Sequence, residues 1–312
     1  MKTTQLARVL LLVALGFLVA LAGCVGQAAS SESEPSAIEK RSFDGQRACQ
    51  YALDQCEIGP RPPGTEAGWV TGEYIIGQLE ELGWAVETQE FEYQGVQLRN
   101  VVGKLGQGPV VILGAHYDTR PVADRDPEHA SEPIIGGNDG ASGVAVLLEL
   151  ADVLVQHELQ NEVWLAFFDA EDSGRLGGWP FCVGSAYMAQ NLAREPDWVI
   201  VVDMVGDRDQ QLYYEGNSDA ALRKKLWDIA AQLGYEQFVP RVRHSIVDDH
   251  LPFAYAGIPA VDIIDFDYPH WHTVGDTCDK VSPESLERVG RVLEEFLVAE
   301  LGDPRTSGEG DR

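Results

Sequence analysis

Residues 163–172 read VWLAFFDAED, an apolar run that ends in three acidic side chains. The run has the length and the apolar content of a fully buried strand. The same order, a buried strand followed at once by titratable residues, occurs in VVILGAHYDT at 110–119 and in WVIVVD at 198–203, and an apolar strand at 260–264 leads towards His272. Ligands of open α/β sheets bind beyond the carboxyl ends of the strands, so we expect these polar residues to lie close together.

Strands and helices alternate along the rest of the chain. The hydrophobic periodicity predicts helices over 43–59, 66–82, 143–156, 185–190, 219–233 and 283–301, and strands over 85–93, 100–104, 109–113, 163–168, 198–202 and 260–264. Such alternation requires crossover connections between strands. It therefore predicts an α/β fold with a mainly parallel central sheet that helices cover on both faces.

The composition allows a large folded core and argues against a nucleic-acid partner. Hydrophobic residues make up 45% of the 312 residues, which is ample for a buried core. Fifty acidic and 23 basic residues give a formal net charge of −27. Because this field repels phosphates, we exclude a nucleic-acid function, and we interpret the acidity as a means of solubility outside the cell.

The first residues have the layout of a secretory signal. A positively charged start precedes apolar residues 9–21, and small residues follow. The apolar run is shorter than the roughly 20 residues that a transmembrane helix needs. Its end, Leu-Ala-Gly-Cys at 21–24, resembles the lipobox of bacterial lipoproteins. We therefore expect a signal peptide at 1–23 and lipidation of Cys24.

The mature chain divides into three parts. Residues 24–42 are rich in Ser, Glu and Ala, which is typical of a flexible tether. Residues 43–301 contain no internal repeat or linker and are expected to form one domain, and residues 302–312 are expected to fray. This layout predicts an exported protein, at the periplasm or the cell surface, that is attached to the membrane by its lipid anchor alone.

Four further cysteines could form disulfides, because export permits them. Cys49 and Cys56 lie seven residues apart in a helical segment, which separates their Cα atoms by about 10 Å at the helical rise and is too far for a bridge. Cys182 and Cys278 both lie in loops that the strand ends bring near one another. A bridge between these two is one expectation, and two free thiols are the other.

The gathered carboxylates and imidazoles indicate a metal site. Buried carboxylates would protonate unless a cation neutralised them, and imidazole with carboxylate oxygen is a ligand set that suits Zn²⁺. The glycine-rich stretch GGNDGASG at 136–143 lets the backbone approach an ion and delivers Asp139. Glu171 and Asp172 are adjacent and point in different directions, so Asp172 can bind metal while Glu171 stays free for proton transfer.

Six motifs resemble those of the zinc aminopeptidases, peptidase family M28, which also contains the animal-type glutaminyl cyclases. They are GAHYDT at 114–119, GGNDGASG at 136–143, FFDAED at 167–172, DMVGD at 203–207, DDHLPF at 248–253 and WHTVGDT at 271–277. The resemblance covers most of residues 43–301. It implies a phosphorylase/hydrolase-like three-layer α/β sandwich with a mixed, mainly parallel central sheet, and a zinc-dependent enzyme that acts on peptides.

The resemblance leaves the zinc count open. Dizinc aminopeptidases use five ligands, and the matching residues here are His116, Asp139, Asp172, Asp203 and His272. Glutaminyl cyclases keep all five and bind one zinc through the positions of Asp139, Asp172 and His272, so that His116 and Asp203 would bind a second zinc only in an aminopeptidase. The family usually has Glu where this chain has Asp172, and the shorter side chain requires the ion or the backbone to shift by roughly 1 Å.

The residues around the ligands favour a cyclase. Trp271, Trp179 and Phe266 resemble the aromatic pocket that holds an N-terminal glutamine in the bacterial glutaminyl cyclases. The resemblance then implies conversion of N-terminal glutamine of peptides or proteins to pyroglutamate, with Glu171 as general acid and base and with Asp203 and Asp248 in its hydrogen-bonded network. The alternatives are a dizinc aminopeptidase and a non-enzymatic metal-binding lipoprotein, although the latter would be expected to lack the base.

Overall fold

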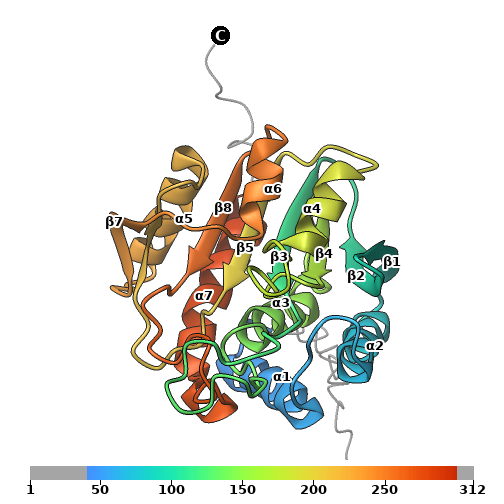
Figure 1. Cartoon of the computed structure of the whole chain (residues 1–312). Coiled ribbons are helices and arrows are strands. Elements are labelled where there is room, and N and C mark those ends of the chain that lie inside the picture. Colours follow the sequence, from blue (N-terminus) through green and yellow to red (C-terminus); the bar gives the residue numbers. More distant parts are fainter. Residues whose placement is uncertain (1–40, 301–312) are drawn as a thin grey trace, which may run out of the picture. The chain divides into compact units, whose positions relative to one another are not determined.

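A computed structural model of the chain describes residues 41–300. Its main sheet has six strands in the order β1-β2-β4-β3-β5-β8 (Figure 1). The strands are β1 (Ala85–Tyr93), β2 (Val96–Leu105), β3 (Val110–His116), β4 (Glu162–Phe168), β5 (Trp198–Asp203) and β8 (Ala260–Ile264). The β4-β3-β5-β8 part is parallel throughout, whereas β1 and β2 run antiparallel to their neighbours. The expectation of a mixed, mainly parallel sheet is confirmed.

Helices cover both faces of this sheet and complete three layers. One core joins one sheet face to α1 (Gly45–Ile58), α2 (Glu66–Glu81), α3 (Ala141–Leu154), α5 (Ala220–Gln232) and α7 (Pro283–Glu295). A second core joins the other face to α4 (Val183–Gln190) and α6 (His250–Tyr255). α3 is apolar almost all round, which is why it is buried along nearly its whole length. Its one buried acid, Glu149, receives Arg47 Nε at 3.1 Å.

The sequence did not predict β6 (Leu212–Glu215), β7 (Phe238–His244) or α6. β6 and β7 form a separate two-stranded parallel sheet. β7 contains Pro240 and exposes most of its side chains, and α6 is short and contains Pro252, so none of the three has a clear apolar period. β2 also begins four residues before the expected start at Asn100, because a tight turn at 94–95 pairs it with β1 over its full length.

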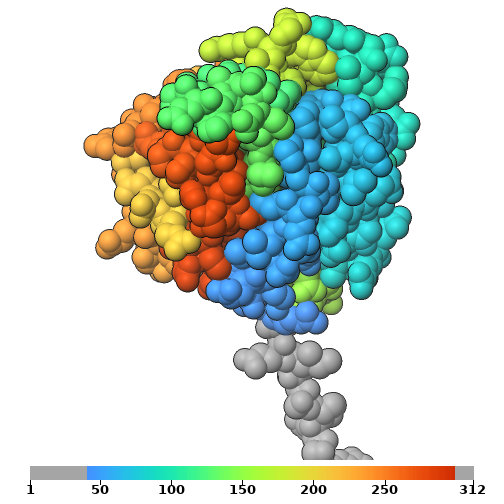
Figure 2. Space-filling view, turned by 60° about the horizontal axis from the view of Figure 1, so that its bottom comes forward, coloured from blue at the N-terminus to red at the C-terminus, as the bar shows by residue number. Residues whose placement is uncertain are grey.

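The first and the last described helices lie against each other, as Figure 2 shows for the blue and red segments. Just before α1, the backbone N–H of Phe43 donates to Glu294 of α7 at 3.0 Å. Arg41, near the end of the expected tether, is also bound, because its guanidinium lies 3.0 Å from Asp152. The expected signal peptide, Cys24 and the tail at 302–312 lie outside the described residues. Within residues 41–300, none of the helices combines the length and the apolar character that crossing a bilayer requires.

The chain contains a disulfide that differs from the one considered above. Cys56 at the end of α1 is bonded to Cys278, with 6.4 Å between their Cα atoms. Cys49 and Cys182 are free. The bridge considered between Cys182 and Cys278 is therefore wrong, because Cys182 is buried on the far side of the site with its Sγ 3.5 Å from Oε1 of Glu171. The exclusion of a bridge between Cys49 and Cys56 is confirmed.

Candidate active site

The strand ends bring five candidate ligands to one edge of the sheet. Each ligand sits at a strand end or in a loop beyond this edge, and each is at least 93% buried: His116 at the end of β3, Asp139 before α3, Asp172 after β4, Asp203 at the end of β5 and His272 after β8. Residues that are more than 150 positions apart in the sequence thus become neighbours.

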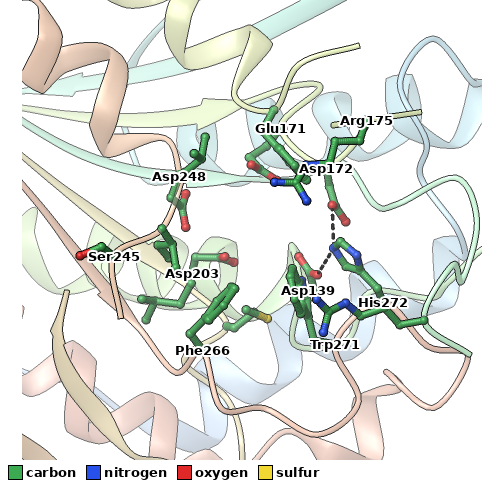
Figure 3. Close-up of a pocket in the computed structure, with 16 residues that line it drawn as sticks. Asp139, Glu171, Asp172, Arg175, Asp203, Ser245, Asp248, Phe266, Trp271 and His272 are labelled. Carbon is green, nitrogen blue, oxygen red and sulfur yellow. Dashed lines mark ion pairs between the residues drawn. The ribbon is translucent and has the colours of Figure 1, made fainter. Parts of the chain in front are cut away.

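The five ligands form two triads that share Asp139. One triad is Asp139, Asp172 and His272, and the other is His116, Asp139 and Asp203, each with its ligand atoms within 4.8 Å of one another. His272 Nε2 lies 3.0 Å from Asp172 Oδ1 and 3.8 Å from Asp139 Oδ2 (Figure 3). His116 Nε2 lies 3.1 Å from Asp203 and 3.2 Å from Asp139. The shorter side chain of Asp172 therefore still reaches the common centre.

The ligand set fits a zinc ion. Oδ2 of Asp139 and Oδ2 of Asp172 are buried without a hydrogen-bond partner among the described residues. Such orphaned acceptors are costly in a dry environment, and a divalent cation would satisfy both. Two carboxylates and one imidazole per triad leave a coordination position free, as catalytic zinc sites require.

A further carboxylate lies next to the Nδ1 atom of each imidazole, on the side away from the other ligands. Asp124 Oδ1 lies 3.4 Å from His272 Nδ1, and Asp118 Oδ1 lies 3.4 Å from His116 Nδ1. Such a partner orients the ring and raises the basicity of the nitrogen that faces the metal. Arg120 connects Asp124 to the metal-binding loop, since it donates to Asp124 at 2.7 Å and to the backbone oxygen of Asp172 at 2.9 Å. No sequence signal had indicated a role for Asp118, Asp124 or Arg120, although Asp118 lies within the GAHYDT motif.

The loop that carries Asp139 is held by groups from distant segments. Asp276 accepts the backbone N–H groups of Asn138 and Asp139 at 2.8 and 3.1 Å. The buried Arg61 donates to the carbonyl of Gly136 at 3.0 Å. Gly140 has φ of +100°, and a Cβ there would meet the carbonyl oxygen of Asp118 at 2.6 Å. Only glycine allows the backbone to bend this closely behind Asp139.

A pocket with a volume of about 310 Å³ opens beside the triads. Figure 3 shows Asp203 and Asp248 on one side of it and the triad of His272 on the other, with Glu171 above. Phe266 and Trp271 also line the pocket, and their rings lie 4.7 Å apart. The pocket is therefore acidic at its inner end and aromatic along one wall. The sequence-predicted residues at 171, 203, 248, 266 and 271 all lie around it.

Trp179 does not lie in this pocket. Its ring packs edge-on against Tyr93 at 4.9 Å, in a small apolar cluster at the other side of the loop that follows Glu171. The same loop instead brings Phe181 to the pocket. The prediction of Trp179 as a pocket residue needs this correction, because the backbone of the loop turns between the two aromatic positions. Arg125, which lies 3.9 Å over the ring of Trp271, is a further pocket residue that the sequence did not indicate.

The surroundings of Glu171 and Asp248 at the pocket raise the pKa values of both carboxyl groups. Burial, together with the nearby Asp172 and Asp248, raises the pKa of Glu171 well above its usual range, although His116 opposes this shift. Burial and the charge of Asp203 raise the pKa of Asp248 to about 7. Groups that titrate near neutral pH can both take up and return a proton at little cost. Asp248 therefore has a pKa that suits general acid and base catalysis, and the raised pKa of Glu171 marks it as a second group at the pocket that can hold a proton.

Several site residues are held in a backbone conformation that side chains rarely adopt. Ala170, Arg175, Cys182, Met204 and His272 have φ between +46° and +65°, and the sixth such non-glycine residue in the described chain lies in the turn after β1. Each such residue costs on the order of 1 kcal/mol or more, which the surrounding fold must offset. The concentration of positive φ next to Glu171, next to Asp203 and at His272 marks this edge as the functional site.

Fold and site together are typical of a hydrolase-like α/β enzyme with a candidate metal site. The family model of peptidase family M28 matches residues 100–297, and the chain belongs to this family. The glutaminyl-peptide cyclotransferase of Drosophila melanogaster is 24% identical over 87% of this chain and 86% of its own length. A glutaminyl cyclase of Bacteroides thetaiotaomicron, solved with N-acetylhistamine, is 34% identical with a TM-score of 0.78 and covers 82% of this chain and 98% of its own.

A protein described as a leucine aminopeptidase precursor from the same bacterium is equally similar. It is 34% identical, with a TM-score of 0.78, and covers 84% of this chain and 99% of its own. The family and the fold are thus established for this chain, and the similar proteins are described as enzymes. Cyclases and peptidases both occur among the similar proteins, so the choice between them depends on the site.

Proposed function

We propose that the chain is a zinc-dependent glutaminyl-peptide cyclotransferase, which converts N-terminal glutamine of peptides to pyroglutamate and releases ammonia. The observation that carries this proposal is the position of Asp248. It lines the pocket beside Glu171 but belongs to neither triad. The pocket therefore offers two carboxyl groups for proton transfer in addition to the ligands. An intramolecular attack by the α-amine needs such groups and no activated water.

The residues of the chain supply binding and proton transfer. Phe266 and Trp271 pack against the methylene groups of the glutamine side chain. Glu171 accepts one proton from the uncharged α-amine as the amine nitrogen forms a bond to the carbon of the side-chain amide, so this nitrogen keeps a single hydrogen. When the bond from this carbon to the amide nitrogen breaks, Glu171 gives the same proton to the departing nitrogen, which leaves as ammonia. Asp248 and Asp203 share protons with one another and orient the departing nitrogen.

Asp139, Asp172 and His272 would hold the zinc ion, which when bound supplies Lewis-acid polarisation of the side-chain amide carbonyl. Asp124 keeps the ring of His272 in place, and Arg120 keeps Asp124 in place. These contacts fix the metal-binding groups before substrate arrives, which lowers the cost of reorganisation during the reaction.

A second candidate is a dizinc aminopeptidase, which cleaves the first residue from a peptide. The observation that favours it is the sharing of Asp139 between two complete triads. In such an enzyme His116 and Asp203 would be ligands, and Glu171 would act as the base for a water molecule.

One experiment separates the two functions. The purified domain is loaded with zinc, and its zinc content per chain is measured. It is then incubated with a peptide that begins with glutamine and, separately, with a leucine anilide. We expect the glutamine peptide to lose the mass of ammonia and the anilide to remain intact. Two tightly held zinc ions, release of aniline and no pyroglutamate would instead establish the peptidase.

A further inference from the structure

A groove between α4 and α6 lies directly beside the pocket. Phe181 and Val247 line both spaces, so the groove and the pocket are adjacent. The groove has a volume of about 470 Å³, which is larger than the pocket itself. Figure 1 shows the two helices side by side on the same face of the sheet. The groove therefore borders the active site.

The lining of the groove is uncharged. Of the described residues that line it, none carries a charge, although the chain has 50 acidic and 23 basic residues. Val247 is 60% exposed and Tyr255 is 83% exposed, and both lie at the edge of this groove. Leu251 and Pro252 form part of its side. Exposed apolar side chains that gather around one hollow indicate a surface that another apolar group covers.

The inner end of the groove touches the proposed base. Cys182 lies there, and its backbone N–H donates to the carbonyl oxygen of Glu171 at 3.1 Å. At the other side, Val247 directly precedes Asp248. The groove thus borders the pocket at the two segments that carry Glu171 and Asp248. A residue that follows a bound glutamine lies within reach of it.

We propose that this groove binds an apolar side chain of the substrate at the second or third position, directly after the N-terminal glutamine. The inference rests on the proposed cyclase function and adds the class of peptide that is converted best. The position of the groove beside the pocket favours the substrate itself as the occupant, and the uncharged lining favours leucine-like side chains. The enzyme therefore selects peptides that begin with glutamine and continue with an apolar residue.

The test compares matched peptides and measures the rate of pyroglutamate formation. The peptides place Leu or its polar near-isostere Asn at position two or three after glutamine. For the native domain we expect kcat/KM to favour Leu by about tenfold at one of these positions, as is typical of one apolar contact. Ala186→Phe, which fills the groove, and Tyr255→Ser, which removes its rim, should bring this ratio close to one. The ratio of kcat/KM for the Leu peptide to that for the Asn peptide is compared, because a general loss of activity lowers both values by the same factor and leaves their ratio unchanged.

Val70→Ser is the matched control, since Val70 is also exposed, at 47%, but lies on α2 away from the groove. It should leave the Leu to Asn ratio of the native domain intact. Pyroglutamate formation with equal rates for Leu and Asn at both positions would overturn the groove proposal alone. No pyroglutamate from any peptide would overturn the cyclase function and the groove proposal with it. A native dimer that Tyr255→Ser converts to a monomer would assign the groove to a second copy of the chain instead.

Discussion

The two triads are alike in composition but differ in their position relative to the pocket. Both contain one imidazole, both share Asp139, and both have a carboxylate behind the imidazole. All three members of the His272 triad line the pocket, whereas His116 lies behind it. His116 is also surrounded by three carboxylates within 3.4 Å.

The different positions of the two triads indicate different roles for similar ligands, one at the substrate pocket and one away from it. Burial alone would lower the pKa of His116, but Asp203, Asp118 and Asp139 raise it well above the usual value. These carboxylates thus favour the charged form of His116, which would compete with a metal ion for the imidazole. In the His272 triad, Asp139 and Asp172 line the pocket, and the Oδ2 atom of each lacks a hydrogen-bond partner among the described residues. We therefore expect one zinc, in the triad of His272, and the following predictions test this asymmetry.

The largest expected effect comes from His272→Ala compared with His116→Ala. Loss of His272 should remove the zinc and lower pyroglutamate formation by a factor on the order of 10³ or more, because the ion is needed to polarise the amide. His116→Ala should keep one zinc per chain and lose less activity. Zinc content by mass spectrometry and kcat/KM are measured on both variants. Equal loss of metal and activity in the two would show that both triads bind metal.

The second prediction concerns Glu171, which neither triad contains. Glu171→Gln should lower kcat by about 10²–10³, because the amine loses its base. The zinc content should stay that of the native domain, since Glu171 is not a ligand. The exposed change Glu128→Gln is the matched control and should have no effect on either quantity. Loss of zinc in Glu171→Gln would move this residue into the metal site and contradict the division between it and Asp172.

The third prediction concerns stability on the His272 side. The bond between Cys56 and Cys278 ties α1 to the end of the loop that carries His272 and Asp276. Replacing both cysteines by serine should lower the free energy of unfolding by about 3–5 kcal/mol, since the bridge closes a long loop. Urea unfolding under oxidising conditions measures this change. Cys49→Ser on the same helix is the control and should unfold close to the native domain, because Cys49 is a free thiol.

The sequence was sufficient for the main sheet and for the clustering of the candidate ligands because both depend on local signals. Strands such as 163–168 are apolar throughout, and their carboxyl ends must meet if the strands are parallel. This reasoning placed His116, Asp172 and Asp203 at one sheet edge, where the structure has them. The motifs then distinguished this edge from any other cluster of acids. No local signal of this kind exists for β7, whose side chains are mostly exposed.

Contacts between loops could not be predicted in the same way. The bond between Cys56 and Cys278 joins residues 222 positions apart, and nothing in the spacing of the cysteines indicates it. The displacement of Trp179 from the pocket goes with a contact to a distant segment, since its ring packs against Tyr93 at 4.9 Å. Asp124 is an exposed residue in an acidic loop, and only the folded chain shows that it supports His272.

The smallest expected effect distinguishes Asp124, which lies next to His272, from Asp118, which lies next to His116. Asp124→Asn should weaken zinc binding by about tenfold to a hundredfold, because the ring of His272 loses its orienting partner. Asp118→Asn should affect zinc less and kcat more, since Asp118 also accepts the backbone N–H of Glu171 at 2.9 Å and so positions the base. Competition with a chelator gives the zinc affinity, and the exposed Asp228→Asn on α5 is the control for a lost charge. If Asp118→Asn weakened zinc binding as much as Asp124→Asn, the His116 side would also hold metal, and the asymmetry between the triads would be lost.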